Sequence, residues 1–452
     1  MREAYFHLAK LLRDANSTDP RAADLLQKSG FTSYDKSEFL TTSLSTNQRD
    51  GATFYPQQIR ELVPGSVWAL SGFEFTEYYF IKSADGKELI AIDAGTRDDT
   101  AIKAYKALRE FAGNLPPLTT VLVTHAHYDH VGGHKAFREM NPGVKFYGRE
   151  NSNVEQNLMR SAPPIGAYFF GTKFSMDAVL SYKPDVLVTQ PTPLNIGGTE
   201  LRLYPVGGGE TLDAMFISLP KHGLLFVGDF IMPYFGAPYV EEGNIDGLFL
   251  AMDIVRDLNP KMVLHGHTPL TQMFQSKAIA QVQRQLKWLR TEVGNLVHTS
   301  TQRSVVHDRN LIPPFIGETR DAQLHYLVLR ENFINRLYDQ LTGYWQPVIE
   351  GLDHLGPRDH AYALVKYFGV SESSLTGILE KMLSNGDLSL ASRTAEQAVI
   401  AFPGSESIRA LRVKTYERLK EKYQETDPFK YFIYSEQIGR ETKAVPTTNF
   451  KP

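Results

Sequence analysis

The sequence predicts an α/β domain followed by an all-helical C-terminal region. Short apolar runs bounded by turn residues recur from about residue 54 to residue 264, with helical patterns between them. After about residue 310 the strand signals fade, and Gly and Pro divide a series of helical patterns. We therefore expect an N-terminal helical arm over residues 1–50, an α/β domain over 51–300 and a helical domain over 301–452.

The composition excludes several classes of function. A net charge of −3 without a long basic run gives no electrostatic basis for nucleic-acid binding, and no apolar run is long enough to span a bilayer. The chain has no cysteine, which excludes disulfides, thiol catalysis and Cys-ligated zinc. Charged residues interrupt the apolar pattern of residues 1–17, so we expect no signal peptide and a cytoplasmic protein; a trimmed N-terminus would allow a periplasmic or secreted one.

The first elements of the α/β domain are strands and one helix. Three apolar, β-rich runs predict strands, with Ser83–Gly86 as the turn between the second and third: Ser66–Leu70, Tyr78–Ile81 and Leu89–Asp93. A helix is expected over 100–112, because its apolar residues recur at helical spacing. The β-branched run Val121–Val123 then predicts a buried strand.

Directly after this strand, the sequence TTVLVTHAHYDHVGGH concentrates metal-ligating residues. His125 and His127 point to the same side of an extended segment, and Asp129 and His130 follow one short turn later. Two nitrogens can hold one metal, and a carboxylate with a nitrogen can hold a second; these donors suit Zn²⁺, with Fe or Mn as alternatives. A polar loop that happens to be His-rich is the weaker interpretation, because four of the 13 histidines lie between positions 125 and 134.

Three further candidate ligands each follow an apolar strand later in the chain. They are Glu210, Asp229 and His267. The alternative is a solvated loop carboxylate for Glu210 and a surface histidine for His267, with which His265 competes. His134 lies outside the spacing and is expected to be structural.

Residues 155–185 form an insertion with many aromatic and apolar residues and poor periodicity. It is either an ordinary packed loop or a wall over the metal site, and we favour the wall because an irregular apolar segment needs a reason to be ordered. The expected substrate-binding residues are Tyr168, Phe169, Phe170 and Phe174.

The helical domain 301–452 contains one clear helix pair, Leu375–Pro403, with Asn385–Asp387 as its turn. A single pair is no solenoid, so a peptide-binding repeat array is the weaker alternative. Apolar residues at helical spacing in Leu327–Leu341 predict that this domain mediates a homodimer.

The spacing HxHxDH followed by Gly132-Gly133 resembles the signature of the metallo-β-lactamase superfamily. The resemblance implies an αββα sandwich, with two sheets face to face, helices outside and two metals at one edge. In that family order, one metal is held by His125, His127 and Glu210, the other by Asp129, His130 and His267, and Asp229 bridges them. Two Zn²⁺ ions sharing one water would lower its pKa enough to give a metal-bridging hydroxide at neutral pH. Asp129 is the residue expected to be essential for catalysis.

A Glu in place of the third His resembles the alkylsulfatase branch of this superfamily, as do Val67–Phe73, Tyr168–Gly171 and Gly343–Trp345. Two features depart from that branch. Asp229 stands where the branch has Glu, and residues 230–243, FIMPYFGAPYVEEG, contain no Arg or His to handle sulfate. The branch's sterol-carrier-like third domain is also not visible.

The expected function is hydrolysis of a small-molecule sulfate ester with an apolar alkyl tail. The alternatives are a lactonase, phosphotriesterase or β-lactam hydrolase on the same two metals. The non-enzymatic alternative is a metal-bound interaction protein that uses the helical domain.

Overall fold

The computed structural model describes residues 8–9, 11–13, 18–29, 57–74, 76–150, 152, 176–232, 243–299, 301–343, 355–423, 430, 434 and 437–438. The chain separates into two compact units, Met1–Leu341 and Thr342–Pro452. In the first unit, the N-terminal arm contributes helix α2, Pro20–Ser29.

The first unit contains a seven-stranded sheet whose strands follow one another in chain order. β1 to β4 pair antiparallel, and β4 to β7 pair in parallel. The parallel strands place their carboxyl ends at one edge of the sheet. The strands are β1 Gln58–Val63, β2 Val67–Ser71, β3 Tyr78–Lys82, β4 Leu89–Ile92, β5 Leu118–Leu122, β6 Lys145–Arg149 and β7 Val186–Val188.

A second, five-stranded sheet has the order β12-β11-β10-β9-β8. Only β11 and β12 pair in parallel among its strands. The strands are β8 Thr192–Ile196, β9 Thr199–Pro205, β10 Met215–Leu219, β11 Leu224–Gly228 and β12 Met262–His265, and the 3₁₀ turn Pro220–His222 lies between β10 and β11.

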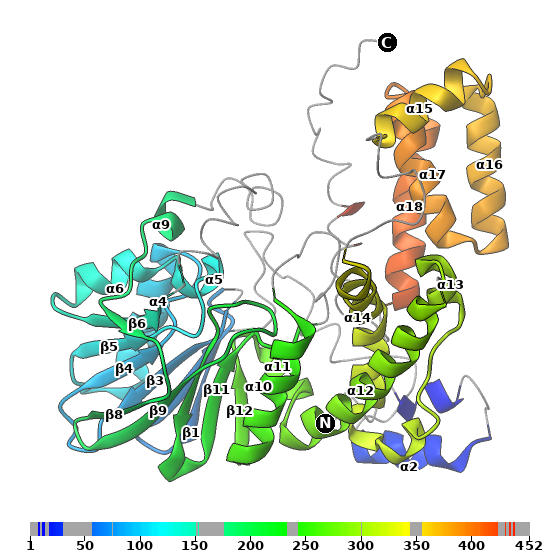
Figure 1. The fold of residues 1–452 in the computed structure, drawn as a ribbon. Helices are drawn as coiled ribbons and strands as arrows, with labels where there is room; N and C mark the ends of the chain where they lie inside the picture. Colours follow the sequence, from blue (N-terminus) through cyan, green and yellow to red (C-terminus); the bar gives the residue numbers. More distant parts are fainter. Residues whose placement is uncertain are drawn as a thin grey trace. The chain divides into compact units, whose positions relative to one another are not determined.

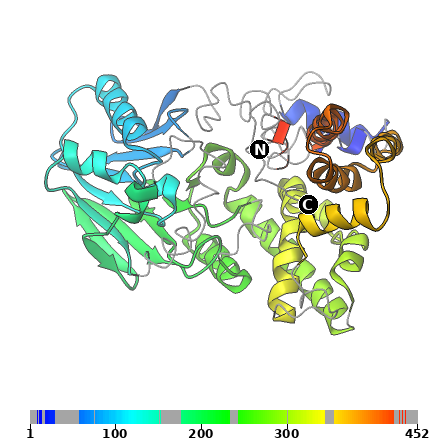
Figure 2. The same cartoon turned by 90° about the horizontal axis from the view of Figure 1, so that it is seen from above.

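The two sheets pack face to face with helices outside, which confirms the predicted αββα sandwich. One buried cluster joins the sheets, with Ile90 and Leu122 against Leu203 and Phe226. Figure 1 shows α4 Asp98–Ala112, α5 Tyr128–Val131, α6 His134–Met140 and α9 Met176–Leu180 over the first sheet. The second sheet is covered by α10 Ile245–Leu258, α11 Thr268–Met273 and α12 Ser276–His298, which Figure 2 shows from above.

The first unit extends past the predicted domain start at residue 301. It also includes α13 Arg303–Asp308, the 3₁₀ turns Ile316–Glu318 and Arg320–Ala322, and α14 Gln323–Thr342 except for its last residue. Phe333 and Leu337 of α14 are buried in the same cluster as Phe249 of α10 and Leu286 of α12. The apolar face of α14 therefore fills the first unit's own core, where the sequence pattern suggested a surface for a second chain.

The second unit is helical, as predicted. Its helices are α15 Pro357–Lys366, α16 Glu372–Asn385, α17 Leu388–Ala401 and α18 Glu406–Tyr423. The predicted helix pair corresponds to α16 and α17, and Gly386 between them has a φ of 81°, a conformation that suits glycine. No helix in the described ranges is long and apolar enough to cross a membrane.

Two buried histidines in the first unit predict a loss of stability in acid. Burial lowers the pKa of His265 and of His325 to about 4. The Nε2 atom of each ring lies within hydrogen-bond distance of a backbone carbonyl, and that of His325 is 2.6 Å from the Met273 carbonyl. The unfolded chain takes up protons near the ordinary pKa of about 6.5, whereas the folded chain does so only near 4. Stability is therefore present above pH 6.5 and is lost as the pH falls toward 4.

We expect His325→Gln to reduce this acid sensitivity. The amide of glutamine can still donate to the Met273 carbonyl, but it does not titrate. Between pH 7.5 and pH 5 the wild-type protein should lose about 2 kcal/mol more unfolding free energy than the variant. Urea unfolding of both proteins at the two pH values measures this difference. Equal losses would show that His325 does not contribute.

Candidate metal centre

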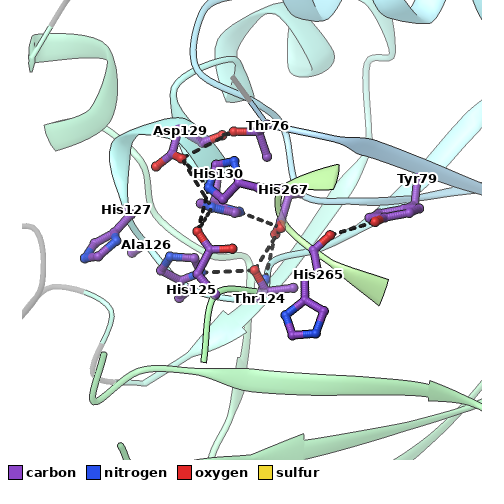
Figure 3. Close-up of polar contacts among 12 residues, drawn as sticks. Thr76, Tyr79, Thr124, His125, Ala126, His127, Asp129, His130, His265 and His267 are labelled. Carbon is purple, nitrogen blue, oxygen red and sulfur yellow. Dashed lines mark hydrogen bonds and ion pairs between the residues drawn. The ribbon is translucent and has the colours of Figure 1, made fainter. Parts of the chain in front are cut away.

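The candidate site lies where strands from both sheets end at one edge of the sandwich. β5 leads into a loop that carries His125 and His127, and His127 is the residue before the first turn of α5. Asp129 and His130 lie on that short helix. Glu210, Asp229 and His267 follow β9, β11 and β12. Figure 3 shows the histidines of the HxHxDH motif and His267 gathered in one region.

The first group of potential ligands consists of His125, His127 and Glu210. Glu210 Oε2 lies 3.3 Å from His125 Nε2 and 3.5 Å from His127 Nδ1. Glu210 and His125 are buried, and His127 is slightly exposed. Gly209 allows its loop to pass close to the segment after β11, because a Cβ there would lie 2.6 Å from the Phe230 carbonyl oxygen.

The second group consists of Asp129, His130, Asp229 and His267, and all four side chains are buried. His267 Nε2 lies 2.7 Å from Asp229 Oδ2 and 3.2 Å from Asp129 Oδ2. His130 Nε2 lies 3.2 Å from the same Asp229 oxygen. Gly266 leaves room for this arrangement, because a Cβ there would lie 2.4 Å from His130 Cε1. All seven predicted ligand residues thus lie in one of two adjacent groups.

Asp93 and Thr124 support the site and were not among the predicted site residues. The Asp93 Oδ2 atom lies 2.8 Å from His130 Nδ1 and also accepts a hydrogen bond from the Thr124 hydroxyl at 2.8 Å. Because the Thr124 hydrogen is used there, its oxygen can accept from His125 Nδ1 at 3.1 Å. Both imidazoles are thereby held with Nε2 toward the ligand groups. The signal in the sequence that could have identified Asp93 is the Asp93-Ala94-Gly95 run directly after β4.

Asp93 also has a φ of 61°, an unfavourable backbone conformation for a residue with a side chain. Its Oδ1 atom accepts a hydrogen bond from the Thr124 amide at 2.7 Å. Such a conformation persists where surrounding contacts enforce it, and it often occurs at functional sites. This observation agrees with a role of Asp93 in orienting the ligands.

Asp213 connects the two loops of the first group. Its Oδ2 atom accepts a hydrogen bond of 2.9 Å from the amide of Ala126, which lies between His125 and His127. The Met215 amide donates to the Thr124 carbonyl at 2.7 Å. Nothing local in the sequence marked Asp213, because its partner lies 87 positions earlier in the chain.

The structure separates His265 and His134 from the ligand groups. The His265 ring points away from the other imidazoles in Figure 3, and its Nε2 atom lies 2.9 Å from the Phe274 carbonyl. His134 Nε2 lies 2.9 Å from the Ala178 carbonyl, which connects α6 to α9. Both histidines therefore have structural contacts, whereas His267 faces Asp129 and Asp229.

Comparison with known protein families agrees with this geometry. Residues 71–267 match the family model of the metallo-beta-lactamase superfamily, and residues 312–440 match the model described as alkyl sulfatase dimerisation. The chain carries a metallo-β-lactamase domain followed by an alkyl sulfatase dimerisation region. The first model covers the strands and loops that present all seven ligand residues.

Individual relatives of this alkylsulfatase-like protein are distant in sequence. The chain is 20% identical over 397 residues to the alkyl/aryl-sulfatase BDS1 of Saccharomyces cerevisiae, and it spans 60% of that protein's length. Its fold is similar to the sec-alkylsulfatase Pisa1 from Pseudomonas sp., with a TM-score of 0.70, 18% identity and coverage of 86% of this chain and 66% of that one. A double mutant of PisA1 gives a TM-score of 0.71 at 18% identity, covering 89% and 70%.

The charges of the metallo-β-lactamase domain's site suit cations. Burial disfavours charging of His130 and His267, but the neighbouring carboxylates outweigh it and raise both pKa values, that of His267 to about 10. Burial also disfavours the Asp229 carboxylate, yet His267 and His130 hold its pKa well below the ordinary value. Asp229 Oδ1 is buried and accepts no hydrogen bond from the described residues. Three buried carboxylates and four imidazoles are the donors that zinc prefers.

The predicted substrate wall cannot be placed. Tyr168, Phe169, Phe170 and Phe174 lie outside the described residues, as do residues 233–242 after Asp229. Met232 is described and is buried in the cluster beneath the second sheet. The role of these four aromatic residues therefore remains a prediction.

Proposed function

We propose that this protein is a dinuclear metal-dependent hydrolase of sulfate esters that carry an apolar alkyl tail. The main observation is the convergence of seven metal-ligating side chains, in two adjacent groups, at the edge where strands of both sheets end. The preference for sulfate esters is supported by the match to the alkyl sulfatase dimerisation model and by relatives named as alkyl sulfatases.

Each group would hold one divalent cation, Zn²⁺ in the first instance. His125, His127 and Glu210 would bind the first, and Asp129, His130 and His267 the second. Asp229 belongs to the second group and is the residue proposed to bridge. When bound, two such cations lower the pKa of a shared water enough to provide hydroxide at neutral pH.

The protein's own residues prepare this chemistry. Asp93 and Thr124 orient His130 and His125 with Nε2 toward the ligand groups. Three carboxylates and one hydroxide would about balance the charge of two divalent cations, because the imidazoles bind as neutral ligands. A site with so little net charge suits a monoanionic sulfate ester better than a dianionic phosphate monoester. Burial of the ligands strengthens these charge interactions by excluding water.

The function can be tested with one substrate panel. The purified protein, with its metal content measured, would be given 4-nitrophenyl sulfate, 4-nitrophenyl phosphate, a chromogenic lactone and a chromogenic β-lactam, together with linear alkyl sulfates. We expect sulfate release from the alkyl sulfates to have the highest kcat/KM. Hydrolysis of the lactone or β-lactam without sulfate release, in protein that contains two metals, would reject the proposal in favour of another hydrolase on the same site.

Tail length should set the affinity for substrate if the aromatic insertion forms the wall. Each methylene buried in an apolar site contributes about 0.8 kcal/mol, so KM should fall progressively with longer alkyl sulfates. Replacing Phe169 and Phe170 with alanine should raise KM for long tails more than for short ones. Steady-state kinetics with C4 to C12 alkyl sulfates measures this trend. Equal effects on all lengths would place the insertion away from the substrate.

We also propose that the chain forms a homodimer through its second unit. The family model of the dimerisation domain covers this unit to residue 440, and Tyr367 and Phe368, which follow α15, are 73% and 76% exposed. Light scattering should give twice the chain mass of 50.9 kDa. Replacing both aromatic residues with serine should shift the mass toward that of one chain, whereas Phe111→Ser, which alters an exposed residue of the first unit, should not. A monomer at micromolar concentration would contradict this proposal.

A further inference from the structure

The segment before β3 contacts the second ligand group at two points. Thr76 is buried, and its hydroxyl donates to the Asp129 backbone carbonyl at 2.6 Å and lies 3.4 Å from Asp129 Oδ2. Figure 3 shows Thr76 beside Asp129, on the side away from His125. This contact restrains both the backbone and the carboxylate of a ligand residue.

The next residue, Glu77, holds both neighbours of another ligand. Its amide donates to the Gly266 carbonyl at 2.8 Å, and its Oε2 atom accepts a hydrogen bond from the Thr268 hydroxyl at 3.0 Å. His267 lies between these two residues. Glu77 therefore holds the loop on both sides of His267: its backbone amide binds Gly266, and its buried side chain binds Thr268.

Glu77 is itself fixed by groups from the first sheet. Its Oε1 atom accepts a hydrogen bond and ion pair from Arg60 of β1, and its Oε2 atom lies 3.1 Å from the Tyr79 hydroxyl. That hydroxyl donates to the His265 carbonyl at 2.6 Å, a contact drawn in Figure 3. Arg60, Glu77 and Tyr79 thus connect the first sheet to the end of β12 in the second sheet.

We propose that Thr76 and Glu77 are positioning residues for the second metal, acting through Asp129 and His267. These two ligands come from different sheets, and their Oδ2 and Nε2 atoms lie 3.2 Å apart. Two adjacent residues of one segment set the position of both. The inference rests on the proposed function only in assuming that this group binds a metal.

The contacts that support the first group do not involve Thr76 or Glu77. His125 and His127 are supported by Thr124 and by Asp213 through the Ala126 amide. Removing a group that orients a metal ligand typically weakens metal binding by about 10–100-fold. Loss of the Thr76 or Glu77 contacts should therefore weaken the second metal and leave the first unchanged.

The experiment measures Zn²⁺ affinity by competition with a chromogenic chelator, without substrate. Two single-site backgrounds separate the metals: Glu210→Ala leaves the second group intact, and His267→Ala leaves the first. In the Glu210→Ala protein, Thr76→Val and Glu77→Gln should each weaken the remaining metal by about 10–100-fold. In the His267→Ala protein, Thr76→Val should change the affinity less than 3-fold.

Two matched controls accompany these variants. Thr76→Ser retains the hydroxyl and should preserve affinity. Glu74→Gln removes another buried carboxyl of the same segment, which binds the Thr100 hydroxyl and the Thr96 amide, and should not alter either metal. If Thr76→Val fails to fold, Thr268→Val decides by the same measurement, since it removes only the hydroxyl that Glu77 holds.

Unchanged affinity in the Glu210→Ala background, or equal weakening in both backgrounds, would overturn the inference. The first result would show that the contacts do not position the ligands, and the second that they support the fold in general. A protein that binds two metals but releases no sulfate would reject the proposed substrate and leave this inference intact.

Discussion

Replacing Asp129 with alanine is expected to reduce hydrolysis by about 10³-fold or more. The variant removes one carboxylate of the second group, whose Oδ2 atom lies 3.2 Å from His267 Nε2. Loss of a metal removes its stabilisation of developing charge and should raise the activation free energy by about 4 kcal/mol. Each 1.36 kcal/mol lowers the rate tenfold. Bound metal should fall from about two per chain to about one.

The fold should survive this change. Thr76 donates to the backbone carbonyl of Asp129, a contact that alanine keeps. Circular dichroism and elemental analysis accompany the kinetics, with Asp99→Ala as the control because Asp99 is an exposed carboxylate on the first turn of α4. Near-normal turnover in Asp129→Ala would show that the residue is assigned to the wrong role.

Removing the metals from the wild-type protein is expected to eliminate activity and to lower stability markedly. Asp129, Asp229 and Glu210 are buried close together, and two bound cations would balance their charges only in the native state. A ligand present at 1,000 times its Kd stabilises the native state by about 4 kcal/mol per site. Dialysis against a chelator should therefore lower the unfolding free energy by several kcal/mol.

Differential scanning calorimetry before and after dialysis measures this loss, and adding back Zn²⁺ should restore both stability and turnover. The same treatment should destabilise Asp129→Ala less, because that variant has one metal fewer to lose. Full activity in protein with less than 0.1 metal per chain would exclude the proposed mechanism.

The sequence located four of the seven ligand candidates through one local motif, and the resemblance to the superfamily located the other three. His125 to His130 form one contiguous motif after an apolar run, and Glu210, Asp229 and His267 each follow such a run. Strands of like direction end at the same edge of a sheet, so their following residues gather without any knowledge of distant contacts. The αββα sandwich was likewise predictable, through the resemblance that the HxHxDH spacing supports.

The residues that orient these ligands could not be identified in the same way. Thr268 bonds to Glu77 across 191 positions, and Tyr79 reaches the His265 carbonyl across 186. A buried Thr or Glu has no local pattern that reveals its partner, because hydrogen bonds between sheets depend on how the sheets pack. The resemblance to the superfamily already favoured His267 over His265, and in the structure the His265 Nε2 atom lies 2.9 Å from the Phe274 carbonyl, away from the ligand groups.

The sequence by itself determined the order of strands and helices, the seven ligand candidates, and the presence of apolar faces in the helical region. The tertiary structure decided what those faces and ligands contact. The periodicity of α14 shows that one face is apolar, but not whether a second chain or the chain's own α10 and α12 cover it; the structure shows the latter. Periodicity records the burial of a face, whereas the identity of the covering surface depends on contacts between residues far apart in the chain.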